Sequence, residues 1–436
     1  MTNRLPQRGE RRPKSAVRLP HKAAVAATLL AVLLTGCLGN DSASPTPSGI
    51  ESKALIKFVA AEYSTATKPY LENLVRDFET KYPDIHVDLQ VINWDILEMM
   101  YNTMISKNQP PDLLTTNTYI QYTKDGMLND LNDMLSSPLR TKLYPFFMQM
   151  DQVGSTQYAI PLVASIRNLY YNKELFDEAG LTEPPRTWSE LEAFAQQIKA
   201  TKKADGFGVD LTDNESQAYL SYFFFGAGGG WMKDGKWAIN SPENIAGLSY
   251  LKELYDKGLT DPEPTVTTRD EKQRILGNGK LGMMLSGNYF ASVVPKEFPG
   301  LKYGFGPMPV RDGQPPVSFG VQDVMLSFKT DHTNKEAIGR FLDFFYEDAR
   351  YEEFVIREGL IPVTKTVGDK MALRDKRMKA HMDDIQGAKF YPLKEPAWPA
   401  VMDATRKLGE AVLSGQMTPK QALDQLQQVA ISKSGK

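Results

Sequence analysis

The sequence predicts an α/β fold with two lobes. Short apolar or alternating runs, which are typical of β-strands, are separated by segments with the spacing of amphipathic helices. This alternation occurs once before residue 160 and again after it. Strands that alternate with helices favour parallel pairing within a sheet. The chain has 436 residues, which is long enough for two such halves.

The first half is predicted to contain strands at 54–60, 85–91 and 112–115 and helices at 68–82 and 95–106. The run 54–60 is short and apolar, as expected of a buried strand, whereas 85–91 alternates apolar and polar residues. Pro110 and Pro111 are expected to end the second helix, because proline cannot continue a helix.

The second half is predicted to contain strands at 168–171, 206–209 and 281–285 and helices at 173–179, 187–201, 241–257, 335–346, 349–358, 399–413 and 419–429. Three capping boxes mark helix starts: Thr187 with Glu190, Thr268 with Glu271, and Thr418 with Gln421. No fixed-period repeat is visible, so the pattern favours paired lobes over a solenoid.

The first 36 residues are typical of a secretory signal. A basic front is followed by an uncharged stretch from Ala23 to Leu34, which is too short to span a bilayer. The ending Leu34-Thr-Gly-Cys37 resembles the lipobox of bacterial lipoproteins, which implies cleavage before Cys37 and lipid attachment to it. The alternative is an ordinary buried cysteine after an apolar helix. Residues 37–52 are rich in Ser, Pro and Gly and predict a flexible tether, so we expect an extracytoplasmic protein that contacts the membrane through lipid alone.

The composition argues against several classes of function. Cys37 is the only cysteine, so neither a disulfide framework nor a thiolate metal site is expected. The net charge is −2 with both signs interspersed, which is unlike the basic stripe of a nucleic-acid-binding protein. The histidines after the signal are far apart, so no zinc site is expected. The sequence has no nucleophile elbow and no Walker motif, and no cofactor is expected.

Several motifs resemble one known family by their order and spacing. They are Tyr158-Ala-Ile-Pro161, Asn168-Leu-Tyr-Tyr-Asn-Lys-Glu-Leu-Phe176, Pro184-Pro-Arg-Thr-Trp-Ser-Glu-Leu191, Gly279-Lys-Leu-Gly-Met-Met-Leu-Ser-Gly287 and Gly359-Leu-Ile-Pro362. Together they resemble the family 1 extracellular solute-binding proteins, the group that contains maltose-binding protein, over nearly all of the mature chain. Asn168 departs from the small residue that is usual at its position.

The resemblance implies a type II periplasmic-binding-protein-like fold, in which crossing segments form a hinge between two lobes. By analogy, the first lobe comprises 53–162 and 308–363, and the second comprises 163–307 and 364–436. The resemblance also implies a monomer that is not an enzyme and that binds a mono- or oligosaccharide or a polyol between its lobes. Binding favours closure, and the closed form docks on the permease of an ABC importer with its separate ATPase.

The first lobe supplies five candidate ligand contacts. Ligands of open α/β sheets bind beyond the carboxyl ends of strands, and Glu62 and Tyr63 follow the first strand there. A carboxylate accepts hydrogen bonds from two neighbouring hydroxyls, which suits a sugar. Asn117 and Thr118 follow the third strand, where the resemblance implies contacts that are charged in the maltose protein. Trp94 follows the second strand and is expected at the rim. The alternative for Glu62 is a surface position before a helix.

The remaining candidates lie in the second lobe or near the hinge. The family stacks aromatic rings on the apolar faces of sugars, and the resemblance places four rings at or near such positions: Tyr219, Trp231, Tyr289 and Trp398. The alternative for each ring is the hydrophobic core. Arg167 lies on a crossing segment, where it pairs either with an acidic sugar or with a structural partner. Gln322 and Asp323 follow Gly320 near the hinge.

Three other functions stay open at this point. Tyr170 and Tyr171 suggest a ferric-iron-binding receptor, but adjacent strand residues point to opposite faces. A secreted polysaccharide-active enzyme would need two carboxylates about 5–10 Å apart in a cleft, and no sequence pattern points to such a pair. A structural adhesin would show no closure on a small ligand.

Overall fold

The computed structural model describes residues 53–434. Helices and strands alternate along most of this chain, which confirms the predicted α/β class. The predicted signal (1–36), the tether (37–52) and the lipidated Cys37 lie outside the described residues and stay predictions. Within 53–434, no helix is long and apolar enough to cross a membrane.

One eight-stranded sheet connects the two halves of the chain. Its order is β2-β1-β3-β12-β6-β10-β7, and β11 pairs with β6 off this path. Strands β2, β1 and β3 are parallel, as predicted, whereas β12 is antiparallel to both β3 and β6. The strands are β1 (Ala54–Glu62), β2 (Ile85–Asn93), β3 (Leu113–Thr116), β6 (Ala159–Asn172), β7 (Asp205–Gly208), β10 (Leu281–Gly287), β11 (Tyr303–Gly306) and β12 (Gly320–Ser327). Two further pairs form short hairpins: β4 (Gln152–Val153) with β5 (Thr156–Gln157), and β8 (Met232–Lys233) with β9 (Lys236–Trp237).

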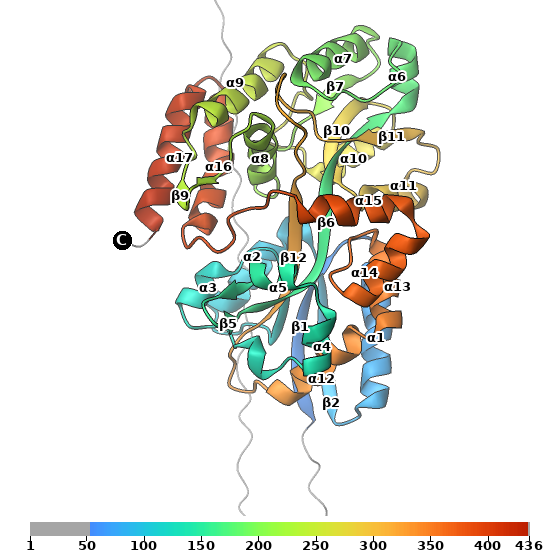
Figure 1. Cartoon of the computed structure of the whole chain (residues 1–436), viewed down its shortest axis with the longest axis vertical. Coiled ribbons are helices and arrows are strands. Elements are labelled where there is room, and N and C mark those ends of the chain that lie inside the picture. Colours follow the sequence, from blue (N-terminus) through green and yellow to red (C-terminus); the bar gives the residue numbers. More distant parts are fainter. Residues whose placement is uncertain (1–52, 435–436) are drawn as a thin grey trace, which may run out of the picture. The chain divides into compact units, whose positions relative to one another are not determined.

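Strand β6 is shared by both halves of the sheet, and Figure 1 shows it running alongside β12 and on toward β10 and β11. Residues 159–166 pair with β12, whereas 167–172 pair with β10 and β11. The sequence predicted only 168–171 of this strand, whereas the structure extends it over Ala159–Asn172. Pro161 is accommodated where the register shifts beside Asp323 and Val324 of β12.

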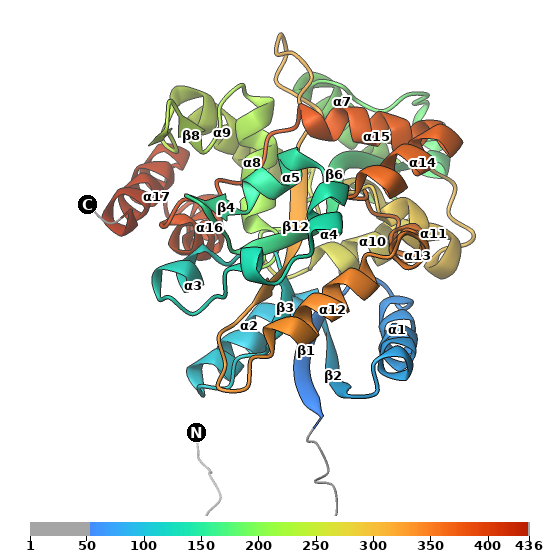
Figure 2. The ribbon, with the colours of Figure 1, turned by 60° about the horizontal axis from the view of Figure 1, so that its bottom comes forward.

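Helices cover both faces of the first part of the sheet, which comprises β2, β1, β3, β12 and the start of β6. One face packs against α1 (Thr67–Lys81), α12 (Lys335–Phe345) and α13 (Asp348–Glu358), and the other packs against α2 (Trp94–Ser106) and α3 (Ile120–Lys124). Figure 2 shows these helices around β1 and β2. The short helices α4 (Ser137–Lys142) and α5 (Pro145–Met150) add to the first face, and η1 (Leu131–Asp133) is a single 3₁₀ turn. We call this part the first lobe.

The second lobe forms around β6, β10, β7 and β11. Its larger core packs α6 (Lys173–Ala179), α7 (Trp188–Ala200), α8 (Ser216–Gly226), α9 (Pro242–Asp256), α16 (Trp398–Leu413) and α17 (Pro419–Lys433). A smaller core lies under α10 (Arg269–Gly277) and α11 (Phe290–Glu297). The three predicted capping boxes are confirmed at the starts of α7, α10 and α17.

The structure corrects the predicted lobe boundary at residue 364. Helices α14 (Lys365–Arg374) and α15 (Lys376–Gln386) were assigned to the second lobe, but Val367, Met378, Met382 and Ile385 belong to the core of the first. Their apolar side chains complete the face that α13 begins, and Figure 1 shows α14 directly beside α13. The chain joins the second lobe only after residue 386, where Lys389 bridges to Phe319.

Candidate ligand-binding site

A cavity lies where the first lobe, the second lobe and strands β6 and β12 meet. The space between its side chains, counted together with open solvent at its mouth, is about 600 Å³. Six sequence-predicted residues line it: Tyr63, Trp94, Asn117, Arg167, Tyr289 and Asp323. Eight others complete the lining: Ser165, Asn214, Glu215, Gln217, Arg269, Val321, Leu360 and Tyr391.

Tyr63 is positioned by a buried threonine at the start of α1. The Thr67 hydroxyl accepts hydrogen bonds from the backbone N–H groups of Tyr63 (2.9 Å) and Ser64 (3.0 Å). The same hydroxyl donates to the carboxylate of Glu358 at 2.9 Å. Thr67 and Glu358 are both buried, and burial raises the pKa of Glu358. The turn that follows β1 is therefore fixed to α13, and the ring of Tyr63 is held at the cavity wall.

Trp94 and Asn117 form the adjoining wall of the first lobe. Trp94 begins α2, because the side chain of Asn93 caps this helix by accepting from the backbone N–H of Asp95 at 2.9 Å. Its ring meets the ring of Tyr63 edge-on, with centroids 5.8 Å apart. The side chain of Asn117 is oriented by Thr118, whose hydroxyl donates to Asn117 Oδ1 at 3.1 Å.

Strands β6 and β12 form the floor of the cavity. Alternate residues of β6 (Ser165 and Arg167) and of β12 (Val321 and Asp323) face the cavity, because side chains alternate across a strand. Gln322 therefore points the other way, and its amide donates to the buried carboxylate of Asp151 at 2.6 Å. Gln322 was predicted as a ligand contact, and the structure places it in the interior instead.

Two arginines and one glutamate dominate the charge of the cavity. Arg167 Nη2 lies 3.5 Å from Glu215 Oε1, and Arg269 donates to the same carboxylate oxygen. Arg269 also pairs with Asp270 at 2.9 Å, and its guanidinium lies 5.5 Å from the ring centre of Tyr289. The side chains of Arg167 and Glu215 are 7% and 5% exposed. Because both are removed from water, their charges interact more strongly than a surface pair would.

Asp323 has an unusual proton affinity for a carboxyl group. Burial raises its pKa to about 7, and this effect outweighs the Tyr63 hydroxyl and the cations of Arg167 and Arg269, which lower it. Asp323 is consequently part protonated near neutral pH. Burial beside Asp323 raises the pKa of Tyr63 well above its usual value, so Tyr63 presents a neutral hydroxyl.

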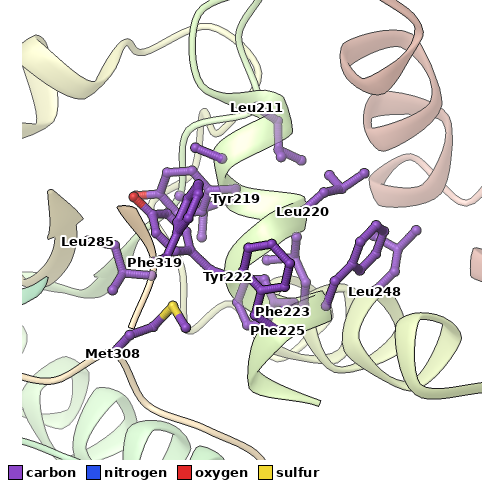
Figure 3. Close-up of a cluster of buried hydrophobic side chains, with 14 of the residues drawn as sticks. Leu211, Tyr219, Leu220, Tyr222, Phe223, Phe225, Leu248, Leu285, Met308 and Phe319 are labelled. Atoms are coloured by element: carbon purple, nitrogen blue, oxygen red, sulfur yellow. The ribbon is translucent and has the colours of Figure 1, made fainter. Parts of the chain in front are cut away.

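Three predicted aromatic contacts lie in the core of the second lobe. Tyr219 is fully buried on α8, and its hydroxyl donates to the backbone carbonyl of Gly208 at 2.9 Å. Figure 3 shows Tyr219 among Leu220, Tyr222 and Phe319. Trp231 is also buried, and its indole N–H donates to Ser221 at 2.8 Å. These residues are corrected from ligand contacts to core residues, because their rings pack inside the hydrophobic core of the second lobe.

Trp398 is likewise buried, and it lies one layer behind the cavity. Its ring stacks on Tyr391 with centroids 5.2 Å apart, and Tyr391 lines the cavity. The prediction therefore identified the supporting ring and missed the ring that lines the cavity. Glu62 lies beside the main cavity, in a hollow that shares Tyr63, Trp94 and Tyr289 with it. Thr118 is buried behind Asn117.

The residues missed by sequence reasoning follow the same strand-end rule that found Tyr63. Asn214 and Glu215 come after β7 and just before α8, and Arg269 is the first residue of α10 after its capping box. Applying the rule to every strand of the second lobe would have indicated Asn214 and Glu215. Leu360 and Tyr391 lie in irregular segments, for which no sequence signal was available.

The structure also bears on the tyrosine pair that suggested iron binding. Tyr170 and Tyr171 lie in different cores, one under α11 and the other against α6. The Tyr170 hydroxyl donates to the backbone carbonyl of Asn288 at 3.3 Å. Two rings on opposite faces of one strand cannot converge on a single metal ion.

Two lobes that share strands, with a polar and aromatic cavity at the junction, define a binding protein of the two-lobed type. The comparison with known proteins agrees. Residues 61–350 match the model of the bacterial extracellular solute-binding protein family, and the chain belongs to this family. Its members are binding proteins rather than enzymes, and they act outside the cytoplasm.

Two relatives and one solved structure are similar to this chain. A protein of Brucella abortus strain 2308, named only as a binding protein, is 29% identical over 374 residues, which cover 84% of this chain and 90% of the relative. The sn-glycerol-3-phosphate-binding periplasmic protein UgpB of Escherichia coli O1:K1 is 26% identical over 61% of this chain and 64% of the relative. A tagatose-bound solute-binding protein of Thermotoga lettingae shares the fold, with a TM-score of 0.79 and 21% identity over 88% of this chain and 100% of that one.

Proposed function

We propose that this chain is the ligand-binding component of an ABC importer and that it binds a mono- or oligosaccharide or a polyol in the cavity between its lobes. The observation that carries the proposal is the lining of the cavity. Aromatic residues from both lobes, Tyr63, Trp94, Tyr289 and Tyr391, alternate with amide and charged groups. A sugar needs both, because its C–H face packs on a ring while its hydroxyls form hydrogen bonds. The T. lettingae neighbour was solved with a sugar.

The same geometry supports a closure mechanism. Trp94 and Asn117 belong to the first lobe, whereas Asn214 and Gln217 belong to the second, and all four line one cavity. A ligand that contacts both walls binds the closed arrangement better than an open one, and this difference in affinity drives closure. The closed form then presents its ligand to the membrane permease, and the separate ATPase drives import.

Calorimetric titration with a sugar and polyol panel tests the ligand class. We expect a dissociation constant of about 1 μM, or about −8 kcal/mol, for the cognate compound. Trp94→Ala should weaken binding at least tenfold. Trp237→Ala is the matched control. Trp237 is also half-buried, it lies far from Trp94 in the sequence, and its indole N–H donates a hydrogen bond to the Ser434 hydroxyl at 2.9 Å. Binding to no member of the panel would reject the carbohydrate assignment.

Small-angle scattering tests the mechanism separately. The cognate ligand should reduce the radius of gyration of the monomer, because the lobes close around it. An unchanged radius of gyration at saturating ligand would contradict closure and favour a rigid binding module.

We further propose that Cys37 carries the lipid that holds the protein at the membrane. The support is the sequence Leu34-Thr-Gly-Cys37 after a basic and apolar leader. Mass spectrometry of the protein purified from membranes should show diacylglycerol on Cys37. Cys37→Ser should release the protein from the membrane fraction, and retention of that variant would refute the anchor.

A further inference from the structure

Arg167 is a buried cation whose hydrogen-bonding capacity is largely unused. Its side chain is 7% exposed. Among the described residues, its Nε and Nη1 atoms have no hydrogen-bond partner. Its one carboxylate contact is Nη2 to Glu215 at 3.5 Å, which is long for a charged pair. Nε carries one N–H and Nη1 carries two, so three donors of the guanidinium remain open.

The second arginine leaves the cavity short of negative charge. Arg269 takes the shared carboxylate of Glu215 and also the carboxylate of Asp270, which is 31% exposed. Two guanidinium groups thus divide one buried carboxylate. The other acid in the lining, Asp323, holds its proton up to about neutral pH because burial raises its pKa to about 7. Asp270 lies outside the lining, so within the lining itself Arg167 and Arg269 face only Glu215 and a part-protonated Asp323, which leaves a small excess of positive charge there.

A buried cation with a single, long carboxylate contact is costly to maintain. Removing a guanidinium from water is strongly unfavourable unless a partner of opposite charge and good geometry compensates. Uncharged hydroxyls of a neutral sugar could accept the open N–H groups, but they would leave the charge uncompensated. A carboxylate or a phosphate accepts hydrogen bonds from the open N–H groups and also neutralises the charge, because its anionic oxygens match the fork of the guanidinium.

On the basis of the proposed function, we propose that the ligand is an anionic carbohydrate or polyol whose acidic group binds Arg167, with Arg269 reinforcing the positive field. The rest of the molecule lies against Tyr63, Trp94 and Tyr391. The shared chemistry is an anionic oxygen group. Its two sources are a sugar acid and a sugar or polyol phosphate.

Matched pairs of probes separate these sources and test the charge requirement. The pairs are galacturonate with galactose, glucuronate with glucose, glucose 6-phosphate with glucose, and glycerol 3-phosphate with glycerol, together with the di- and trisaccharide forms of the uronates. A thermal-shift screen of the whole panel selects pairs for calorimetry. We expect the anionic member of at least one pair to bind tenfold or more tightly than its neutral partner. Tight uronates identify a carboxylate, and tight phosphates identify a phosphoester.

Substitutions assign the preference to Arg167. Arg167→Gln should abolish it, with at least a tenfold loss for the anionic probe and a change of less than threefold for any neutral one. Arg167→Lys should restore part of it, because the charge returns without the fork. The matched control is Arg357→Gln, since Arg357 is exposed and pairs with Glu353 on the same helix. Circular dichroism and the melting temperature verify folding, and weakening of wild-type binding by salt gives a readout independent of any variant.

The outcomes separate this inference from the proposed function. A neutral sugar that binds as tightly as its acidic partner, or a preference that survives in Arg167→Gln, overturns the anionic ligand and leaves the carbohydrate-binding function intact. An absence of binding across the whole panel overturns both.

Discussion

Replacing Asn288 by alanine should lower the free energy of unfolding by about 1.5–4.5 kcal/mol, although Asn288 lies outside the lining of the cavity. Its side chain joins three segments. Oδ1 accepts from the backbone N–H of Ile166 at 2.9 Å, and Nδ2 donates to the carbonyl of Gly359 at 2.8 Å. The backbone of Asn288 also donates to Ile166 O at 2.9 Å, so the residue is held against β6 where the strand passes between the lobes.

The magnitude follows from the groups that alanine would leave unpaired. The N–H of Ile166 is buried, and leaving it without a partner costs about 1–3 kcal/mol. The carbonyl of Gly359 is half-buried, so its loss adds about 0.5–1.5 kcal/mol. Asn288→Asp should cost less than alanine, because Asp retains the acceptor for Ile166 and loses only the donor to Gly359.

Urea unfolding followed by tryptophan fluorescence measures this effect. Asn240→Ala is the matched control, since Asn240 is exposed and its hydrogen bond of 2.9 Å to Asp424 lies in solvent, where its loss costs less than about 1 kcal/mol. The reasoning is refuted if Asn288→Ala is no more destabilising than this control.

Three further predictions follow from the site. Thr67→Val should lower the free energy of unfolding by about 2–3 kcal/mol and weaken ligand binding, because the backbone N–H groups of Tyr63 and Ser64 lose their acceptor. Thermal unfolding measures the first effect and calorimetry the second. Unchanged affinity would show that this turn does not position Tyr63. Trp398→Phe should reduce stability by about 1–3 kcal/mol yet change affinity less than threefold, and a large loss of affinity at full stability would restore Trp398 as a ligand contact. Asp323 binds its proton in the folded state up to about pH 7 but releases it near 3.8 when unfolded, so its contribution to stability falls as pH rises through this interval. In urea unfolding, the wild type should lose about 2–3 kcal/mol of stability relative to Asp323→Asn between pH 5 and pH 7, and little more above pH 7. Parallel pH profiles of the two proteins would contradict a buried carboxyl group.

The sequence predicted the α/β class and much of the cavity because both depend on local signals. Tyr63, Trp94 and Asn117 lie just beyond strand ends, and the carboxyl ends of parallel strands meet at one edge of a sheet. Chain order alone therefore placed them together. Arg167 and Asp323 were predicted from their positions near crossing segments, and the structure brings both into the lining.

The aromatic contacts of the second lobe were harder to predict, because a ring in the core and a ring in the cavity differ in the direction they point and not in residue type. Helix α8 shows the difficulty. Every residue from Ser216 to Gly226 is buried, so its sequence has no polar stripe to reveal a helix or to indicate which way Tyr219 points. Trp398 and Tyr391 stack on one another, and only the three-dimensional arrangement decides which ring faces the cavity.

The predicted lobe boundary at residue 364 was wrong for a related reason. Nothing in the sequence of α14 and α15 distinguishes a helix of one lobe from a helix of the other, since both would show an apolar face. Their membership depends on which core that face meets, and Met378 and Ile385 meet the core of the first lobe.

The placement of Arg167 on β6, the strand common to both lobes, divides the work of capture between two sets of residues. In the proposed closure, a side chain on this strand moves little as the two walls approach each other, so it is equally available before and after closure. For the proposed anionic ligand, its attraction would govern the rate of capture and would add the same affinity to both arrangements. Trp94 and Asn214 stand on opposite walls, and their contacts exist together only in the shut arrangement. They would set how long the solute is retained before it is handed on.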